Sequence, residues 1–430
     1  MVSAYRADAL RDPTTELKEF YTKNSSSSNF PAEVTRHFSS MFSAEGAFKE
    51  IPTLDVETPP EDYPDRSVVR FRAMVQDPSP SAEMYLCKTN TGGLGGWGIH
   101  EESDVEDTLD YADLRECTVL WAVSVPGESR WCSDELNGQD SDSPSEVPTL
   151  HVLFIRPHEE TLLTRLYPQA TTGNTDIAQI REDLILWIAN ETLDGDRDVA
   201  EWVLLVCIAK VISRSPPLLP PSLTISHFPS PPVPFTNSSD NHNASSITIP
   251  ALSHVLSQLL PLFKTAPLSL EMLNKIPFAP ESKDEDLHSG VLQLPRGSVL
   301  LVTEGNVREG RLGQRGLTNI GILQEVIAAQ SLAYIFPFSQ FSFPTDISCV
   351  ILSEGKKSAF FKTDISVPFR PTSPSANAIS RLYKPAENIS MPLPSELAAF
   401  RDLVIGARLG KVHVSQTTSE VRLLHNIRYE

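Results

Sequence analysis

Three short runs of apolar and β-branched residues constrain the fold of this chain more than any other feature. They are LTISHF at 223–228, SVLLVT at 298–303 and ISCVIL at 347–352. Runs of this length and composition are typical of buried strands. Apolar residues recur at helical spacing before and between these runs, at 177–189, 196–212 and 249–263. Two helical layers around such strands predict an α/β centre.

The N-terminal part of the chain follows other patterns. Leu17 and Phe20 fall on one face of an expected helix, and a second helical pattern follows at 30–42. Further on, alternating apolar and polar residues predict short strands joined by loops. We interpret these strands as a small β domain in the form of a partial OB-like barrel. One more strand is expected at 148–155.

Shifts in composition predict where the domains begin and end. The expected fold class is α/β, or α+β over the whole chain. The expected parts are N-terminal helices at 1–50, the small β domain at 51–132, an acidic disordered linker at 133–148, the α/β domain at 149–367 with a low-order insert at 229–246, a Pro-rich linker at 368–394 and C-terminal helices at 395–430. The linkers are poor in apolar residues and therefore have little surface to bury in a core.

The charge of the chain limits its partners. It carries 36 Lys and Arg residues against 55 Asp and Glu residues, which gives a net charge of -19. Such a field repels phosphate backbones, so direct DNA binding is disfavoured. No run is long and apolar enough for a membrane span, and no secretory signal is expected. Five cysteines without a CxxC pair suggest reduced thiols in the nucleus or the cytoplasm.

The strand at 298–303 ends in residues that bear on nucleotide chemistry. In P-loop ATPases the end of such a strand carries an Asp-Glu pair, and the Asp holds Mg²⁺. This chain has Thr303 and Glu304 at these positions. A neutral hydroxyl does not supply the charge that Mg²⁺ requires from a carboxylate. We therefore expect no catalytic residue, no metal site, no cofactor and no small-molecule substrate.

Four sequence blocks resemble the minichromosome maintenance (MCM) complex-binding protein family. The blocks are FRAMVQD at 71–77, VSVPGESRW at 123–131, GVLQLP at 290–295 and ISCVILSEGK at 347–356. Their order is also similar to that of the family. The chain departs from the family by carrying less β sequence between residue 131 and the run at 148–155.

The centre of the chain also resembles MCM helicase subunits. DGDRDVAEWVLLVCIAK at 194–210 looks like the helix before their ATP-binding strand, and LTISHF takes the place of that strand. The helicases continue with a GxxxxGK[ST] loop, whose amides and Lys hold phosphate. Here PSPPVPFTNSSDN follows at 229–241, with prolines that lack amide donors and with no Lys. IGILQEVIAAQSLAY at 320–334 is similar to the helix and strand start after the acidic pair.

A third altered position follows from the same likeness. Ser353, Glu354 and Gly355 stand where the helicases carry a polar sensor residue at the end of a strand. Together with Thr303 and the missing phosphate loop, this implies a degenerate AAA+-like domain, a pseudo-ATPase. The resemblance implies that such a catalytically inactive domain docks onto a helicase subunit without turning over ATP.

The resemblance implies a non-enzymatic regulator that binds MCM helicase subunits and supports DNA replication during the cell cycle. It implies a role in the assembly, handling or chromatin unloading of MCM complexes, and in sister chromatid cohesion. The expected location is the nucleus, with the cytoplasm as an alternative. The partner-binding residues are expected in an exposed turn, formed by Pro126, Gly127, Glu128, Ser129, Arg130 and Trp131.

Two other functions remain open from the sequence. One is an active ATPase with an atypical nucleotide loop, for which calorimetric ATP binding is the discriminating observation. The other is an OB-like protein that binds single-stranded nucleic acid through aromatic side chains. The candidate stacking residues are Phe71, Tyr85, Trp97 and Trp121. Packing in the core is the more common use of such residues.

Overall fold

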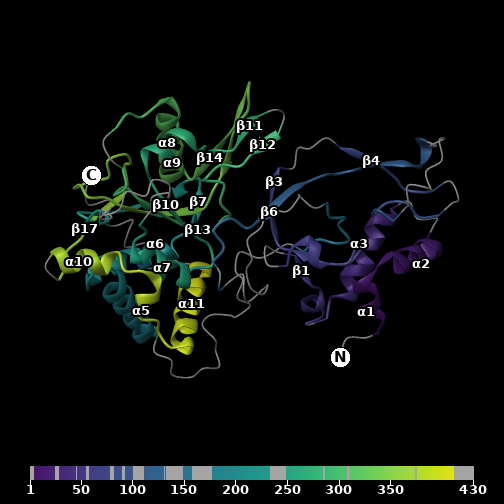
Figure 1. Ribbon diagram of the computed structural model, residues 1–430, viewed down its shortest axis with the longest axis horizontal. Helices are drawn as coiled ribbons and strands as arrows, with labels where there is room; N and C mark the ends of the chain where they lie inside the picture. Colours follow the sequence, from purple (N-terminus) through teal and green to yellow (C-terminus); the bar gives the residue numbers. More distant parts are fainter. Residues whose placement is uncertain are drawn as a thin grey trace, which may run out of the picture. The chain divides into compact units, whose positions relative to one another are not determined.

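The structure is a computed structural model, shown in Figure 1, and it consists of two compact units. Unit 1 comprises the described residues within Met1–Glu160, Ile276–Arg296 and Ser331–Thr345, and unit 2 those within Thr161–Lys275, Gly297–Gln330 and Asp346–Glu430. The structure describes residues 4–24, 29–44, 46–54, 58–77, 82–89, 93–99, 111–129, 131, 149–156, 177–232, 248–283, 286–307, 310–372 and 375–410.

Unit 1 begins with three helices that share one core. They are α1 (Ala4–Arg11), α2 (Thr14–Asn24) and α3 (Phe30–Met41). The amide of Thr14 donates to Asp12 Oδ1 over 2.9 Å and so starts α2. Leu17, Val34 and Phe38 are buried against one another. The two helices predicted from apolar spacing are confirmed as α2 and α3.

The strands near the N-terminus pair two by two. β1 (Thr53–Leu54) pairs with β2 (Arg70–Phe71), β3 (Ala73–Asp77) with β6 (Trp121–Ser124), and β4 (Glu83–Leu86) with β5 (Leu114–Cys117). Short 3₁₀ turns accompany them at Ala47–Glu50, Pro60–Asp62 and Tyr111–Asp113. Within the described residues no larger sheet joins these pairs. The OB-like form of this region therefore stays a prediction.

The strand expected at 148–155 is not formed. Residues 149–156 pair with no strand in the described part of the chain. Leu153 and Phe154 instead pack against the N-terminal helical core, and Trp97 Nε1 donates to the Val152 carbonyl over 3.2 Å. Side-chain packing on the helices therefore replaces backbone pairing, and the segment belongs to unit 1.

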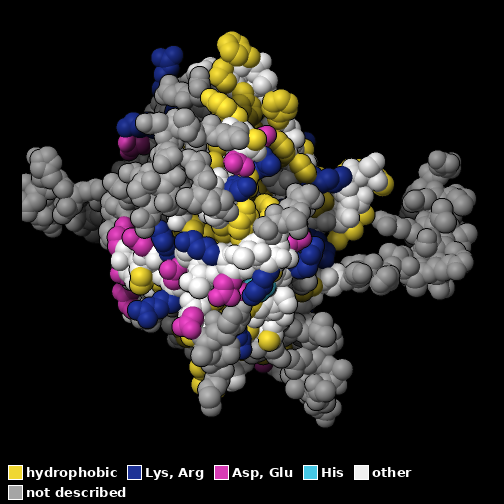
Figure 2. All heavy atoms as spheres, turned by 90° about the vertical axis from the view of Figure 1, so that its right-hand side faces the viewer, with side chains coloured by type: hydrophobic (Ala, Val, Ile, Leu, Met, Phe, Trp, Pro, Cys, Tyr) yellow, Lys and Arg dark blue, Asp and Glu magenta, His cyan; other side chains and the backbone are white. Residues whose placement is uncertain are grey.

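Unit 1 also contains a four-stranded sheet built from later parts of the chain. Its order is β12 (Asp286–His288), β11 (Glu281–Lys283), β14 (Ser331–Ile335) and β15 (Gln340–Pro344). The edge strand β15 is exposed along its whole length. Phe338 at the turn of this hairpin is fully exposed, and Phe341 and Phe343 are about half exposed. Figure 2 shows hydrophobic side chains gathered toward the top of the view.

Unit 2 is built on a five-stranded sheet in which every neighbouring pair is parallel. The strand order is β10 (Phe263–Pro267), β13 (Ser298–Thr303), β16 (Ile347–Leu352), β9 (Leu223–Ser226) and β17 (Ile365–Pro368). The three apolar runs singled out in the sequence are β9, β13 and β16, and the three strands are buried throughout. The α/β fold class is confirmed.

Helices cover both faces of this sheet, as Figure 1 shows. They are α5 (Ile177–Thr192), α6 (Arg197–Ile208), α7 (Ala251–Leu259), α8 (Leu270–Lys275), α9 (Gln314–Ala329), α10 (Ser375–Leu382) and α11 (Pro394–Leu409), and β7 (Ser213–Arg214) and β8 (Pro217–Leu218) form a small hairpin. Apolar residues of α5, α6, α7 and α11 form one core with β9 and β13. Within the described residues, no helix is both long and apolar enough to cross a membrane.

In the segment at 368–394, which was expected as a linker, the described residues form an ordered part of unit 2. It contains α10 and a 3₁₀ turn, Ala386–Asn388. Leu382 and Ile389 lie in the core, and Arg381 pairs with Asp194 over 3.1 Å. The apolar residues between the prolines explain the difference, because they pack on the neighbouring helices. The acidic stretch at 133–148, residues 233–246 of the insert and residues 411–430 lie outside the described residues.

The uncharged edge of β15 predicts self-association. Residues 331–344 contain no charged side chain, and an exposed apolar edge strand is a template for pairing with another chain. Replacing Phe341 and Phe343 with Thr retains β-strand propensity and removes apolar surface. We expect the double variant to scatter less light than the parent at high protein concentration. Its unfolding temperature should fall slightly, because the ring contacts of Phe343 with Tyr334 and of Phe341 with Phe336 are lost.

The control for this experiment is Tyr111→Thr, which removes an aromatic ring that is 86% exposed outside this sheet. It should leave the scattering unchanged. Equal scattering by the parent and the Phe341/Phe343 variant would contradict the role assigned to the edge.

Candidate functional site

The carboxyl ends of three buried strands meet at one edge of the unit 2 sheet. In register, Thr303 of β13 lies beside Leu352 of β16, and Leu352 lies beside Ile225 of β9. In parallel α/β sheets ligands bind at this edge. The residues singled out from the sequence, Thr303, Glu304, Ser353, Glu354 and Gly355, directly end or follow β13 and β16. The fold therefore brings the residues at the end of β13 and the residues that follow β16 to the same edge of the sheet.

The loop after β9 is tied to the loop after β16. His227 has a φ of 57°, which is in the left-handed region, and its amide donates to the Gly355 carbonyl over 3.1 Å. The amide of Phe228 donates to the Ser353 carbonyl over 2.9 Å. These backbone groups therefore bind each other at the position where a phosphate loop would present its amides to a ligand.

Phe228 anchors this loop in the interior. Its side chain is buried, and its ring lies 5.5 Å from that of Phe369 and 6.1 Å from that of Tyr383. The Tyr383 hydroxyl donates to the Pro229 carbonyl over 2.7 Å. Burial, with a smaller contribution from Glu354, raises the pKa of Tyr383 above its usual value. The hydroxyl thus keeps its proton and remains a donor at neutral pH.

The loop also closes the space next to β13. Ser230 Oγ donates to the Gly305 carbonyl over 3.3 Å. A Cβ placed on Gly305 would lie 2.9 Å from Pro231 Cδ, so the two loops are already in close contact. Proline has no amide hydrogen to offer an anion. The described part of this loop therefore fills the sheet edge with side chains and has few donors for phosphate.

Thr303 and Glu304 are both buried within the protein. The Thr303 hydroxyl is buried and has no hydrogen-bond partner among the described residues. The Glu304 carboxylate accepts hydrogen bonds from Ser358 Oγ and, over 3.0 Å, from the Ala359 amide. Ser358 Oγ in turn accepts from the Phe361 amide over 2.9 Å. Glu304 therefore holds the turn after β16 in place.

The expected sensor position is also occupied by local contacts. Ser353 Oγ donates to the Lys357 carbonyl over 3.1 Å, and the Gly355 carbonyl accepts the His227 amide. Glu354 is exposed. Among the described residues, no group of three or more His, Cys, Asp or Glu side chains is arranged to hold a metal ion.

The turn proposed as a partner site is less exposed than expected. The Glu128 amide donates to the Val125 carbonyl over 3.3 Å, and Gly127 has a φ of 77°, which is typical of a type II turn with Pro126 before it. Glu128 pairs with Arg72, and both side chains are mostly buried. This pair draws the turn onto the strands.

The two residues after Glu128 that the structure describes are buried. Ser129 is 5% and Trp131 is 8% exposed, and Arg130 lies outside the described residues. The expectation that this turn is freely exposed is therefore wrong for Ser129 and Trp131. Its role in partner binding stays a prediction, and substitutions there would affect folding as well as binding.

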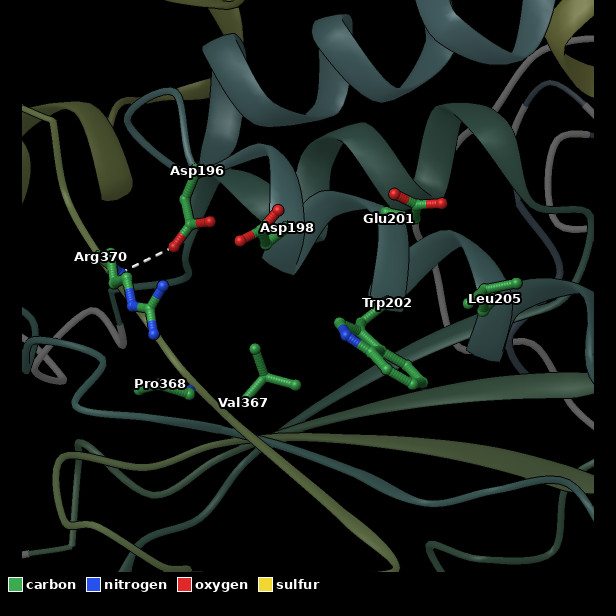
Figure 3. Close-up of a pocket in the computed structure, with 8 residues that line it drawn as sticks. All are labelled: Asp196, Asp198, Glu201, Trp202, Leu205, Val367, Pro368 and Arg370. Atoms are coloured by element: carbon green, nitrogen blue, oxygen red, sulfur yellow. Dashed lines mark hydrogen bonds between the residues drawn. The ribbon is translucent and has the colours of Figure 1, made fainter. Parts of the chain in front are cut away.

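A second site in unit 2, a groove, was missed from the sequence. Figure 3 shows the groove between α6 and β17. It has a volume of about 340 Å³, and its lining residues are Asp196, Asp198, Glu201, Trp202, Leu205, Val367, Pro368 and Arg370. A signal was present, because Asp198, Glu201, Trp202 and Leu205 follow the helical spacing i, i+3, i+4, i+7. Helical spacing at 196–212 predicted a layer around the strands but did not show which face of the helix is exposed.

The family model and the individual relatives that match this chain all indicate the same family. The sequence model of a family described as mini-chromosome maintenance replisome factor matches residues 38–143 and 134–422. Proteins named mini-chromosome maintenance complex-binding protein are similar to the chain, with 29% identity over 260 residues in Salmo salar and 29% over 250 residues in Arabidopsis thaliana. The relative from Drosophila melanogaster is 28% identical over 288 residues.

These matches differ in how much of each chain they cover. They include 57%, 56% and 65% of this chain, in the same order. They span 38%, 40% and 45% of the three relatives. The chain therefore matches less than half the length of these relatives.

The Thr303 hydroxyl has no partner among the described residues, and this predicts a stabilising substitution. Burying a hydroxyl without a partner is unfavourable, so Thr303→Val should raise the free energy of unfolding by about 1 kcal/mol. The measurement is urea denaturation followed by circular dichroism.

Thr224→Val is the matched control, because Thr224 is also a buried threonine of this sheet. Its hydroxyl lies 2.7 Å from Thr363 Oγ1 and shares a hydrogen bond with it. Loss of this hydrogen bond in Thr224→Val should lower the free energy of unfolding by about 1 kcal/mol. A loss of stability in both variants would show that the Thr303 hydroxyl has a partner.

Proposed function

The chain belongs to the mini-chromosome maintenance replisome factor family, and we propose that it is a non-enzymatic protein that binds MCM helicase subunits. The observation that carries this proposal is the extent of the family match, which includes residues of both compact units. The names of the relatives from Salmo salar and Arabidopsis thaliana describe them as MCM complex-binding proteins.

The sheet edge of unit 2 supports the pseudo-ATPase part of the proposal. A nucleotide site of the P-loop type needs amide donors, a Lys for phosphate and a carboxylate for Mg²⁺. In the described residues, Phe228 and Pro229 are packed into this edge by Phe369 and Tyr383. Thr303 stands at the position where the carboxylate is needed. We propose that unit 2 keeps a helicase-like shape for docking and does not turn over ATP.

The cellular role is a further part of the proposal. Binding of MCM subunits would place the chain in the nucleus, with a cytoplasmic pool as an alternative, and in DNA replication. The steps that we propose are the assembly, handling or chromatin unloading of MCM complexes, with a contribution to sister chromatid cohesion. The net charge of -19 favours contacts with proteins over direct contacts with DNA.

The first test is co-elution with purified proteins. Recombinant MCM helicase subunits, singly and as the assembled complex, are mixed with the full chain and separated by size-exclusion chromatography. We expect at least one subunit to elute earlier together with the chain. The chain alone and each subunit alone are the references. If every subunit elutes at its own volume at micromolar concentrations, the proposed binding is wrong.

The second test addresses nucleotide chemistry. Isothermal titration of the full chain with millimolar Mg²⁺-ATP should give only heats of dilution, because the sheet edge lacks a phosphate cradle in its described part. An active MCM helicase preparation serves as the positive control for nucleotide and buffer. A saturable heat signal near one ATP per chain would favour the alternative of an active ATPase.

A further inference from the structure

One face of α6 presents a mixed apolar and acidic stripe to solvent. Trp202 is 36% and Leu205 is 41% exposed, although both are large apolar residues. They follow Asp198 and Glu201 at helical spacing, so the four side chains line the same side of the helix. An exposed Trp is the kind of residue enriched at the centre of protein interfaces, and the exposed Leu205 extends the apolar surface beside it.

The opposite wall of the groove is the edge of the sheet. β17 pairs with β9 on one side and has no further strand beside it among the described residues. Its last residue, Pro368, has no amide hydrogen, which prevents a regular ladder with an added strand at that position. Figure 3 shows Val367 facing Trp202 across the groove. The groove is therefore suited to side chains of a partner more than to backbone pairing.

A hydrogen-bonded corner fixes one end of the groove. Asp196 caps α6 by accepting from the Val199 amide over 3.2 Å, and its other oxygen accepts from the Arg370 amide over 2.7 Å. Asp196 is buried and therefore already used for structure. The corner joins α6 to the end of β17, so both walls keep their positions without a ligand.

The charges in the groove favour a basic partner. The lining contains the three carboxylates of Asp196, Asp198 and Glu201 against the one guanidinium of Arg370. Glu201 pairs with Arg181 outside the groove. Asp198 is exposed and makes no ion pair with another described residue. A Lys or Arg of the partner would meet this carboxylate next to apolar surface, where water screens the attraction less than in bulk.

The size and exposure of the groove point to a segment of protein chain. A volume of about 340 Å³ is at the low end for ligand pockets, and such pockets enclose most of a small molecule. Here Trp202 and Leu205 remain more than a third exposed, so the groove is shallow. One or two bulky side chains of a longer segment fit this shape, with the rest of the segment in solvent.

We propose that the groove between α6 and β17 binds a segment of an MCM subunit that carries a bulky apolar side chain next to a Lys or Arg. This inference rests on the proposed function and adds the surface and the chemistry of the contact. The apolar side chain packs between Trp202 and Val367, and the basic group pairs with Asp198. A second copy of the chain is a poorer partner, because its own net charge of -19 repels the acidic lining.

The test compares groove variants of the full chain in capture of the MCM complex. Trp202→Ala/Leu205→Ala should weaken capture by roughly tenfold or more, as loss of interface anchors does. Asp198→Lys should also weaken it, and capture by the parent should fall as NaCl rises from about 50 to about 300 mM. Overlapping 15-residue peptides from the MCM subunits identify the segment, and those bound should carry Lys or Arg beside a large apolar residue.

Matched controls separate the loss of the groove contact from a general loss of binding or of stability. Leu186→Ala removes a leucine that is also 41% exposed, on α5 and outside the groove lining. Glu325→Lys reverses an exposed charge on α9. Both controls should capture the complex as the parent does, and thermal unfolding checks that each variant folds.

The results separate a failure of the proposed groove contact from a failure of the proposed binding to MCM subunits. If the parent captures the complex and the folded groove variants capture it equally well, the inference is wrong and the proposed function stands. If the parent captures no MCM subunit, the proposed function itself is wrong. A dimer of the chain that the Trp202→Ala/Leu205→Ala variant abolishes would identify a second copy as the occupant and overturn the inference.

Discussion

The structure of unit 2 depends on covering both faces of a parallel sheet. β9, β13 and β16 are buried at every residue, so neither face of the central strands can meet water. This constraint requires the helices that surround the sheet, including α10, whose buried Leu382 lies in a segment rich in proline. It also aligns the carboxyl ends of the strands, which places Thr303 beside Leu352 and thus next to the loop that begins with Ser353.

The sequence predicted the parts of this arrangement that depend on local pattern. Apolar runs revealed the central strands, and helical spacing revealed α2, α3, α5, α6 and α7. Packing between distant residues was not visible. Leu153 and Phe154 have strand-like neighbours in sequence, yet their side chains bind the helices of unit 1. Phe228 could be read as a strand residue, but only its contacts with Phe369 and Tyr383 reveal that it fills the sheet edge.

The candidate sites also differ in how much of each could be predicted from the local sequence. Thr303 and Glu304 were found because a strand end has a fixed place in a parallel sheet. The groove was not found, because its second wall, Val367 and Pro368, is far from the groove residues of α6 in the chain. The burial of Ser129 was missed for a similar reason, since it depends on a turn held by the Glu128–Arg72 pair. Local composition cannot show a neighbour that only the fold supplies.

The path of the chain between the two units has a consequence for dissecting the protein. The four-stranded sheet of unit 1 is made of Ile276–Arg296 and Ser331–Thr345, and both segments are continuous in sequence with strands or helices of unit 2. Gln76 of the N-terminal region donates to the Leu287 carbonyl over 3.2 Å, so early and late segments depend on each other. Neither unit is encoded by one uninterrupted stretch. A cut after residue 160 would leave all segments of unit 2 on one fragment but would divide unit 1, and a cut anywhere within 276–345 would divide both units. Point substitutions are therefore the sounder way to separate the roles of the two units.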